Sequence, residues 1–165
     1  MVQIAVSARA GVKMKTIEIE VALMSHIGVR QNIIVPNVSW SFLPYEADLV
    51  VLTKSNYATE IEIKVSKADL KKDKEKKHNH NSNLFKYLYF AVPVELTEFA
   101  LTEIPEKAGL YEIGRYGNRN FVKQIKPPIL NKNHVKWNID QRLKLAELGC
   151  MRILGLKKRA IKKPR

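Results

Sequence analysis

The sequence predicts an α/β fold, a mixed β-sheet flanked by helices, with a basic C-terminal helix and tail. Three observations lead to this fold class. Segments with helical periodicity alternate along the chain with segments in which apolar and polar residues alternate at every second position. Residues 84–92 form a nearly continuous apolar and aromatic run, as expected of a central buried strand. Residues 109–113 and 120–125 resemble a hairpin around Gly117-Asn118.

The first third of the chain predicts one helix and several strands. Residues 16–27 favour a helix with Thr16 as the N-cap and Gly28 as the C-terminal stop, although part of this segment also alternates like a strand. Strands are expected at residues 31–35, 38–43, 46–52 and 58–66. Pro36-Asn37 separates the first two strands, and residues 53–57 form a hairpin loop between the last two.

The rest of the chain adds three helices and a linker. The helices are expected at residues 67–81, with Ser66 as N-cap, at 93–103 and at 140–156. Pro127-Pro128 begins a linker, so residues 1–126 are expected to form the main domain. Residues 127–165 are then a linker, a C-terminal helix and a basic tail that packs on the same domain. The tail from Lys157 onward is expected to be mobile.

The charge of the chain predicts a polyanionic partner. Lys and Arg total 29 against 16 acidic residues, which gives a formal net charge of +13. Such an excess is typical of proteins that bind nucleic acid. The 45% of apolar residues indicates a folded domain, and the single Cys150 fits a reducing compartment. The start lacks a signal-peptide pattern and no run reaches membrane-spanning length, so a cytoplasmic protein with no membrane partner is expected.

The pattern Asp48, thirteen residues, then Glu62-Ile63-Lys64 lies within two of the strand-like segments. If the hairpin between them is centred on Ser55, antiparallel pairing places Asp48 opposite Glu62. Two facing carboxylates favour a cation between them, and hard divalent metals prefer oxygen ligands. Period two also places Lys64 on the same face as Glu62. The spacing therefore predicts two carboxylates and one ammonium group together at the edge of a sheet.

An alternative interpretation of the same strand is an ordinary solvated face. Glu60, Glu62 and Lys64 alternate with apolar residues, as in an antiparallel strand that has one face toward water. The same register places Glu46 opposite Lys64, and a surface ion pair of that kind contributes about 0–1 kcal/mol. The alternation by itself does not decide between a site and a solvated face.

This arrangement, with a helix before the two strands and a helix directly after them, resembles the PD-(D/E)XK nuclease superfamily over about residues 16–115. The stretches that look most like MmcB-type DNA-repair and phage-borne members are Tyr45-Glu-Ala-Asp-Leu-Val-Val-Leu52, Glu62-Ile-Lys-Val-Ser-Lys-Ala-Asp-Leu70 and Lys86-Tyr-Leu-Tyr-Phe-Ala-Val-Pro93. Ala47 replaces the usual Pro of the motif, and the last fifty residues lie outside the resemblance.

The resemblance implies a restriction-endonuclease-like fold and a metal-dependent DNA endonuclease in DNA repair, recombination or phage DNA metabolism. It implies that Asp48 and Glu62 bind Mg²⁺ or Mn²⁺, with the Ile63 carbonyl as a third ligand. Lys64 would orient the attacking water or stabilise the charge that builds on the phosphate. The chemistry is metal-assisted hydrolysis of a phosphodiester bond.

Two of the expected helices add candidate residues near this site. Many members of the superfamily take a further metal ligand from the first helix, and here Glu20 is preferred over Glu18 because it flanks the apolar stripe of that helix. Lys67, Lys71 and Lys72, on the helix after the motif, are expected to steer DNA phosphates toward the site. For each of these lysines the alternative is a solvated helix face.

The tetrapeptide His78-Asn-His-Asn81 is interpreted as a polar loop, because two histidines without further ligands nearby do not make a metal site. Two other functions stay open beside the nuclease: a noncatalytic DNA-binding module of the same fold, and a basic RNA-binding or assembly protein. A small nuclease that cuts both strands of a duplex commonly needs to dimerise, so a homodimer is one expected assembly.

Overall fold

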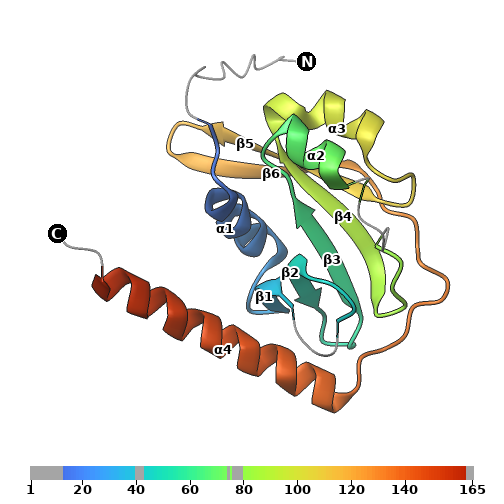
Figure 1. Ribbon diagram of the computed structural model, residues 1–165, viewed down its shortest axis with the longest axis vertical. Helices are drawn as coiled ribbons and strands as arrows, with labels where there is room; N and C mark the ends of the chain where they lie inside the picture. Colours follow the sequence, from blue (N-terminus) through green and yellow to red (C-terminus); the bar gives the residue numbers. More distant parts are fainter. Residues whose placement is uncertain (1–12, 40–42, 74, 76–79, 163–165) are drawn as a thin grey trace.

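The computed structural model, which describes residues 13–39, 43–73, 75 and 80–162, has a six-stranded mixed β-sheet flanked by helices (Figure 1). The predicted α/β class, a mixed sheet flanked by helices, is therefore confirmed. The strands are β1 (Ile33–Val38), β2 (Ala47–Leu52), β3 (Ala58–Ile63), β4 (Phe85–Pro93), β5 (Gly109–Tyr116) and β6 (Arg119–Lys126). The helices are α1 (Thr16–Ile27), α2 (Lys67–Asp73), the 3-10 turn η1 (Val94–Leu96), α3 (Thr97–Glu103) and α4 (Ile139–Lys162).

The strands lie in the sheet in chain order, from β1 to β6. β3, β4 and β5 are parallel to one another, and the other neighbouring pairs are antiparallel. Parallel neighbours need a crossover connection, and the chain supplies α2 for the first crossover and η1 with α3 for the second. The crossovers bring α2 directly behind the end of β3, where the predicted motif lies.

Helices cover both faces of the central strands. On one face, α1 contributes Ile19 and Leu23 to a core that includes Ile61 and Ile63 of β3. On the other face, α2 and α3 pack on β4 and β5, and the linker and α4 pack on β1 and β2. Trp137 is the anchor of this last contact, because it is buried against Val50, Leu52 and Phe85.

The predicted hairpin register is confirmed. Leu49 pairs with Ile61 and Val50 with Glu60, so continuing the ladder by one residue places Asp48 opposite Glu62. The loop is closed by a hydrogen bond from the amide of Thr53 to the carbonyl oxygen of Tyr57 at 3.0 Å. A one-residue slip would have sent the two carboxylates to opposite faces.

Several element boundaries differ from the expected ones. Pro36 does not break the first strand, because β1 is an edge strand whose outer side needs no ladder hydrogen bond. The N-cap of α1 is Lys15 and not Thr16, because the backbone amide of Lys15 donates to the carboxylate of Glu18. Ser66 caps α2 as expected, because its hydroxyl oxygen accepts a hydrogen bond from the backbone amide of Asp69. The helix itself is shorter than expected and spans Lys67–Asp73. Residues 74 and 76–79 lie outside the described part.

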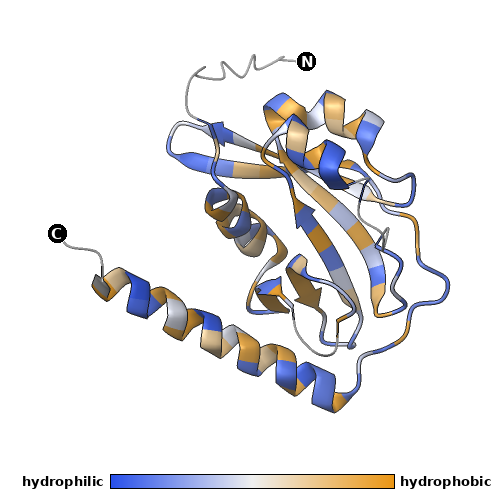
Figure 2. Cartoon of the chain, viewed as in Figure 1, coloured by the Kyte–Doolittle hydropathy of each residue, from blue (hydrophilic) through white to orange (hydrophobic). Residues whose placement is uncertain are grey.

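The C-terminal helix is longer than expected. Residues 157–162 continue α4 as helix, so within the described residues the basic segment is not an irregular tail. Leu145 and Leu148 are buried, whereas Leu143, Leu154 and Ile161 are exposed, so apolar side chains lie on both the covered and the solvent side of the helix. Hydrophobic and hydrophilic residues alternate along its ribbon (Figure 2). None of the helices in the described ranges is long and apolar enough to cross a membrane.

Candidate active site

The polar face of β3 is buried. Glu60 and Glu62 are 0% exposed and Lys64 is 7% exposed, so the alternative interpretation of a solvated strand face is wrong. The physical reason is the central place of β3: Ile61 and Ile63 pack toward α1, and period two turns Glu60 and Glu62 toward the opposite, covered face. Burial of unpaired charges is very costly, so these groups must be held by partners.

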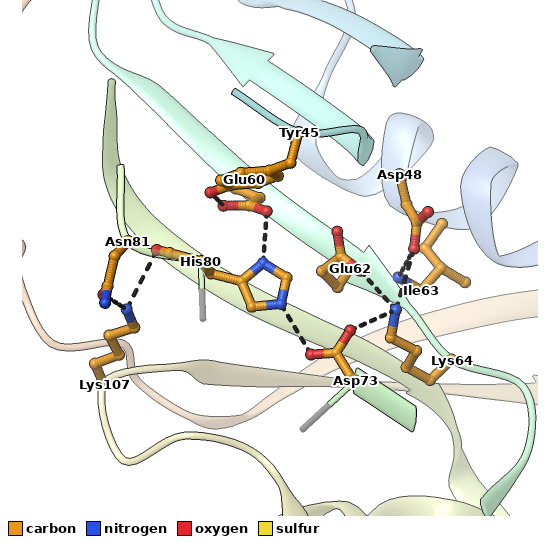
Figure 3. Close-up of polar contacts among 10 residues, drawn as sticks. All are labelled: Tyr45, Asp48, Glu60, Glu62, Ile63, Lys64, Asp73, His80, Asn81 and Lys107. Carbon is orange, nitrogen blue, oxygen red and sulfur yellow. Dashed lines mark hydrogen bonds and ion pairs between the residues drawn. The ribbon is translucent and has the colours of Figure 1, made fainter. Parts of the chain in front are cut away.

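The ammonium group of Lys64 lies among three carboxylates (Figure 3). Nζ of Lys64 is 2.5 Å from Oε2 of Glu62, 3.1 Å from Oδ1 of Asp73 and 3.6 Å from Oδ2 of Asp48. Burial acts to lower the pKa of Lys64, but the charges of Glu62 and Asp48 outweigh it and raise the pKa above its usual value. Lys64 therefore carries its positive charge, and Glu46, which is exposed, is not among its partners in the described residues.

Asp48 is the most accessible carboxylate of the group. Its side chain is 35% exposed, and its Oδ2 accepts a hydrogen bond from the backbone amide of Ile63 at 2.8 Å. This bond fixes the carboxylate of Asp48 against the end of β3, next to Glu62 and Lys64. Asp48, Glu62 and Lys64 of the predicted set thus come together at the end of β3, with Asp48 on the solvent side and the amide of Ile63 bonded to it.

The network continues through residues that the sequence analysis did not select. Oδ2 of Asp73 is 2.8 Å from Nε2 of His80, and Nδ1 of His80 is 2.8 Å from Oε1 of Glu60. The hydroxyl of Tyr45 then donates to Oε2 of Glu60 at 2.8 Å. These contacts form one continuous chain of polar groups from Lys64 to Tyr45 (Figure 3).

His80 is the central charged group of that chain. It lies in a turn, as expected of a loop residue, but it is only 5% exposed, and His78 lies outside the described residues. Burial acts to lower the pKa of His80, but its hydrogen bonds to Asp73 and Glu60 outweigh this and raise the pKa to about 9. The imidazole is therefore protonated at neutral pH and bridges two carboxylates.

Of the residues that extend the network beyond Lys64, only Asp73 was recognisable from sequence. Asp73 follows Asp69 at a spacing of four on α2, which places both on one side of a helix. Nothing in the pattern His78-Asn-His-Asn81 shows that one histidine folds back onto β3. A positive φ of 51° at His80 produces this turn, and that conformation is uncommon for a residue other than glycine.

The two candidate glutamates of α1 have different surroundings. Glu18 forms an ion pair with Arg115, and its pKa is lowered by the backbone hydrogen bond from Lys15 and by Arg115. Glu20 is half-buried, and its pKa is raised by burial and by the nearby charge of Asp48. Glu20 is therefore the α1 glutamate that interacts electrostatically with the predicted site.

Lys67, Lys71 and Lys72 are exposed on α2, whose last residue, Asp73, belongs to the network. Nζ of Lys67 lies 5.1 Å and Nζ of Lys71 6.0 Å from the centre of the Phe99 ring on α3. The two lysines thus rest on an aromatic side chain while their charges face solvent.

Two cavities reach the buried network. One of about 440 Å³ is lined by Glu60 and His80 together with residues at the start of β4 and in the linker, including Lys86 and Asn131. A second cavity of about 290 Å³, between α2 and α3, is lined by Asp73 and His80. Solvent and small ions therefore have a route to the network from sides other than Asp48.

Comparisons with known proteins support the fold and name no function. No protein-family model matches the chain, and no curated protein matches it. One solved structure, the SPO1766 protein of unknown function from Silicibacter pomeroyi, is similar to it, with a TM-score of 0.59 and 15% sequence identity. The match covers 87% of this chain and 89% of that chain. At this identity the similarity shows a shared fold alone.

Proposed function

We propose that the protein is a divalent-metal-dependent nuclease of restriction-endonuclease-like fold that hydrolyses phosphodiester bonds in DNA. The observation that carries the proposal is the convergence of Asp48, Glu62 and Lys64 at the open end of β3, with the amide of Ile63 fixing Asp48. Packing does not require a buried lysine among carboxylates, because apolar residues of similar size fill such a position as well or better.

The types of residue at the end of β3 suit a hard divalent cation. Asp48, Glu62 and the carbonyl of Ile63 would offer oxygen ligands from two adjacent strands, and Glu20, whose pKa the charge of Asp48 helps to raise, would add a carboxylate from α1. Oxygen-only ligand sets suit Mg²⁺ and Mn²⁺. Such an ion polarises a phosphoryl oxygen and lowers the pKa of bound water.

Lys64 would supply the positive charge that does not depend on the metal. Its ammonium group is held by Glu62 and Asp73 and carries a raised pKa, so it stays charged at any pH at which DNA cleavage is assayed. A fixed cation beside Asp48 can orient the attacking water and stabilise the negative charge that develops on the phosphate. Removal of a group of this kind typically costs about 10²–10³-fold in rate.

The charge of the whole chain supports a nucleic-acid substrate. The formal net charge of +13 provides a long-range attraction for phosphates, and Lys67, Lys71 and Lys72 lie on the helix that ends in the network. The single Cys150 is exposed and free, which fits action in the reducing cytoplasm. A noncatalytic DNA-binding module would need the lysines alone and not the carboxylates at the end of β3.

The test is cleavage of labelled single-stranded, duplex and branched DNA in Mg²⁺, Mn²⁺ or EDTA. The wild type is compared with Asp48→Asn and Lys64→Ala, and Glu46→Gln serves as the control because Glu46 is an exposed carboxylate at the same end of the hairpin. Metal-dependent cleavage that both site variants lose by about 10²-fold or more, and that the control keeps, supports the proposal. DNA binding without cleavage in any metal, unchanged in both variants, would contradict it.

A further inference from the structure

A second group of metal-binding side chains lies deeper in the fold than Asp48. Glu60, Glu62 and His80 each offer one ligand atom, and these atoms all lie within 4.8 Å of one another. All three residues are buried. Glu62 belongs to both groups, whereas Glu60 and His80 have no part in the proposed phosphodiester chemistry.

We propose that Glu60, Glu62 and His80 form a binding site for a divalent transition-metal ion, such as Zn²⁺ or Mn²⁺. This site goes beyond the nuclease proposal and does not depend on it. One imidazole nitrogen with two carboxylates is a ligand set that suits Zn²⁺ and Mn²⁺, whereas Mg²⁺ prefers oxygen ligands and water.

The distances fit such an ion. Two ligands at about 2.1 Å from one ion lie roughly 3–4 Å from each other. Nδ1 of His80 and Oε1 of Glu60 are already 2.8 Å apart, and ligand atoms of the set that are up to 4.8 Å apart need to approach by about 1–2 Å. Lys64 contacts Glu62 through Oε2, and because a carboxylate has two oxygens with several lone pairs, one glutamate can serve Lys64 and an ion together.

The surroundings of His80 are those of a metal-binding histidine. Its second ring nitrogen, Nε2, is 2.8 Å from Oδ2 of Asp73. A metal-bound histidine almost always donates its other N–H to a carboxylate, a carbonyl or water, which fixes the ring orientation and raises the basicity of the ligand nitrogen. On the other side, the hydroxyl of Tyr45 donates to Oε2 of Glu60 and holds that carboxylate in place.

The electrostatics and the access route support the same assignment. Glu60 and Glu62 lie on one face of β3. The pKa of Glu60 is raised by burial and by the charge of Glu62. A cation between the two carboxylates would offset both the burial of the negative charge and the repulsion between the glutamates. The cavity of about 440 Å³ is lined by Glu60 and His80 and gives an ion an entry path. In the metal-free protein the proton on Nδ1 of His80 would occupy part of the cation's place.

The experiment is metal titration of the EDTA-treated full chain by isothermal calorimetry, with Zn²⁺, Mn²⁺ and Mg²⁺ in separate runs. Wild type is expected to bind one Zn²⁺ ion, and His80→Gln and Glu60→Gln are expected to weaken this binding at least tenfold. His134→Gln is the matched histidine control, because His134 lies in the linker and contacts Asn131. Asp48→Asn is expected to leave Zn²⁺ binding within threefold.

Wild type alone provides a second readout, which guards against a variant that fails to fold. Uptake of the ion requires neutral His80, so titration near pH 7 in buffers of different ionisation enthalpy should reveal release of about one proton per Zn²⁺. Nitrogen-15 spectra of the histidine rings should show one buried imidazole shifting with the metal. Tyr45→Phe, which keeps all three ligands, is expected to weaken binding about tenfold.

Two results would overturn the assignment. One is that the folded wild type shows no change in the signal of a histidine ring when either Zn²⁺ or Mn²⁺ is added. The other is Zn²⁺ binding that Asp48→Asn abolishes while His80→Gln retains it. DNA cleavage in Mg²⁺ is assayed on the same preparations. Cleavage without Zn²⁺ binding would remove only this site, and His80-dependent Zn²⁺ binding without cleavage would remove only the nuclease proposal.

Discussion

The carboxylate of Asp73 lies 3.1 Å from the ammonium group of Lys64 and joins the end of α2 to the end of β3. The same carboxylate contacts His80 through its other oxygen. Asp73 therefore holds the two buried cations of the network at fixed positions, and the geometry around Lys64 depends on a residue nine positions further along the chain.

Replacing Asp73 should destabilise the fold strongly. Asp73→Asn keeps the shape but leaves Lys64 and His80 with one fewer negative partner, and breaking a buried ion pair costs about 3–5 kcal/mol. Urea denaturation measures the change. Asp69→Asn, four residues earlier on the same helix and half-buried, keeps a side-chain oxygen for the Ser66 hydroxyl and loses only a charge in the first turn of α2, so it should cost about 1 kcal/mol or less. Equal losses in the two variants would contradict the assigned role of Asp73.

The stability of the protein should fall as the pH rises from 6.5 to 9. The pKa of His80 is raised to about 9 in the folded protein from 6.5, so the stability from its protonated form is full below pH 6.5 and is lost as the pH rises through 9. A shift of this size corresponds to about 3 kcal/mol at most. Denaturation across this pH range should show the decrease in wild type, and His80→Gln should be nearly insensitive to pH between the same limits.

Replacement of each of the two glutamates of α1 should affect DNA cleavage differently. Glu20→Gln is expected to lower metal-dependent DNA cleavage by about tenfold and to raise the Mg²⁺ concentration needed, because Glu20 interacts with Asp48. Glu18→Gln should leave cleavage within about threefold, since Glu18 pairs with Arg115 away from the site. The reverse order would assign the α1 ligand to Glu18.

The lysines of α2 should contribute to DNA affinity through phosphate contacts. Replacement of Lys67, Lys71 and Lys72 by Ala is expected to reduce the slope of log K against log salt concentration by about 2–3 for duplex DNA. Binding is measured in EDTA so that cleavage does not interfere. The matched control replaces three cations of α4, Lys157, Lys158 and Arg159, and should leave the slope unchanged if α2 is the contact surface. An equal decrease in both triple variants would indicate nonspecific attraction by the whole surface.

Trp137 should determine whether the C-terminal segment stays attached. Its side chain is 1% exposed, its Nε1 donates to the carbonyl oxygen of Leu84 at 2.7 Å, and it packs on Phe85. Trp137→Ala is therefore expected to cost about 3–5 kcal/mol in the free energy of unfolding. Ile161→Ala, at a position of α4 that is 83% exposed, should change it by about 0.5 kcal/mol or less.

Local sequence signals were sufficient for most of the elements and for the register of the central hairpin, whereas β1 runs through the strand break expected at Pro36. The loop centred on Ser55 and the alternation in residues 58–63 placed Asp48 opposite Glu62 before any tertiary contact was considered. The element boundaries that were predicted wrongly depend on the tertiary structure. The edge position of β1 tolerates Pro36, and His80, which was expected to lie within the second helix, lies in a turn with a φ of 51°.

The sequence by itself determined the α/β class, the order of the elements and the meeting of Asp48, Glu62 and Lys64, because hydrophobic period and turn chemistry act over a few neighbouring residues. Only the tertiary structure decided that the polar face of β3 is buried, that Glu20 lies near Asp48, and that Asp73, His80 and Tyr45 complete the network. Alternation is the same for a strand facing water and for a strand facing a charged interior. The difference arises only when Asp73 of the crossover helix α2 and the side chain of His80 cover that face.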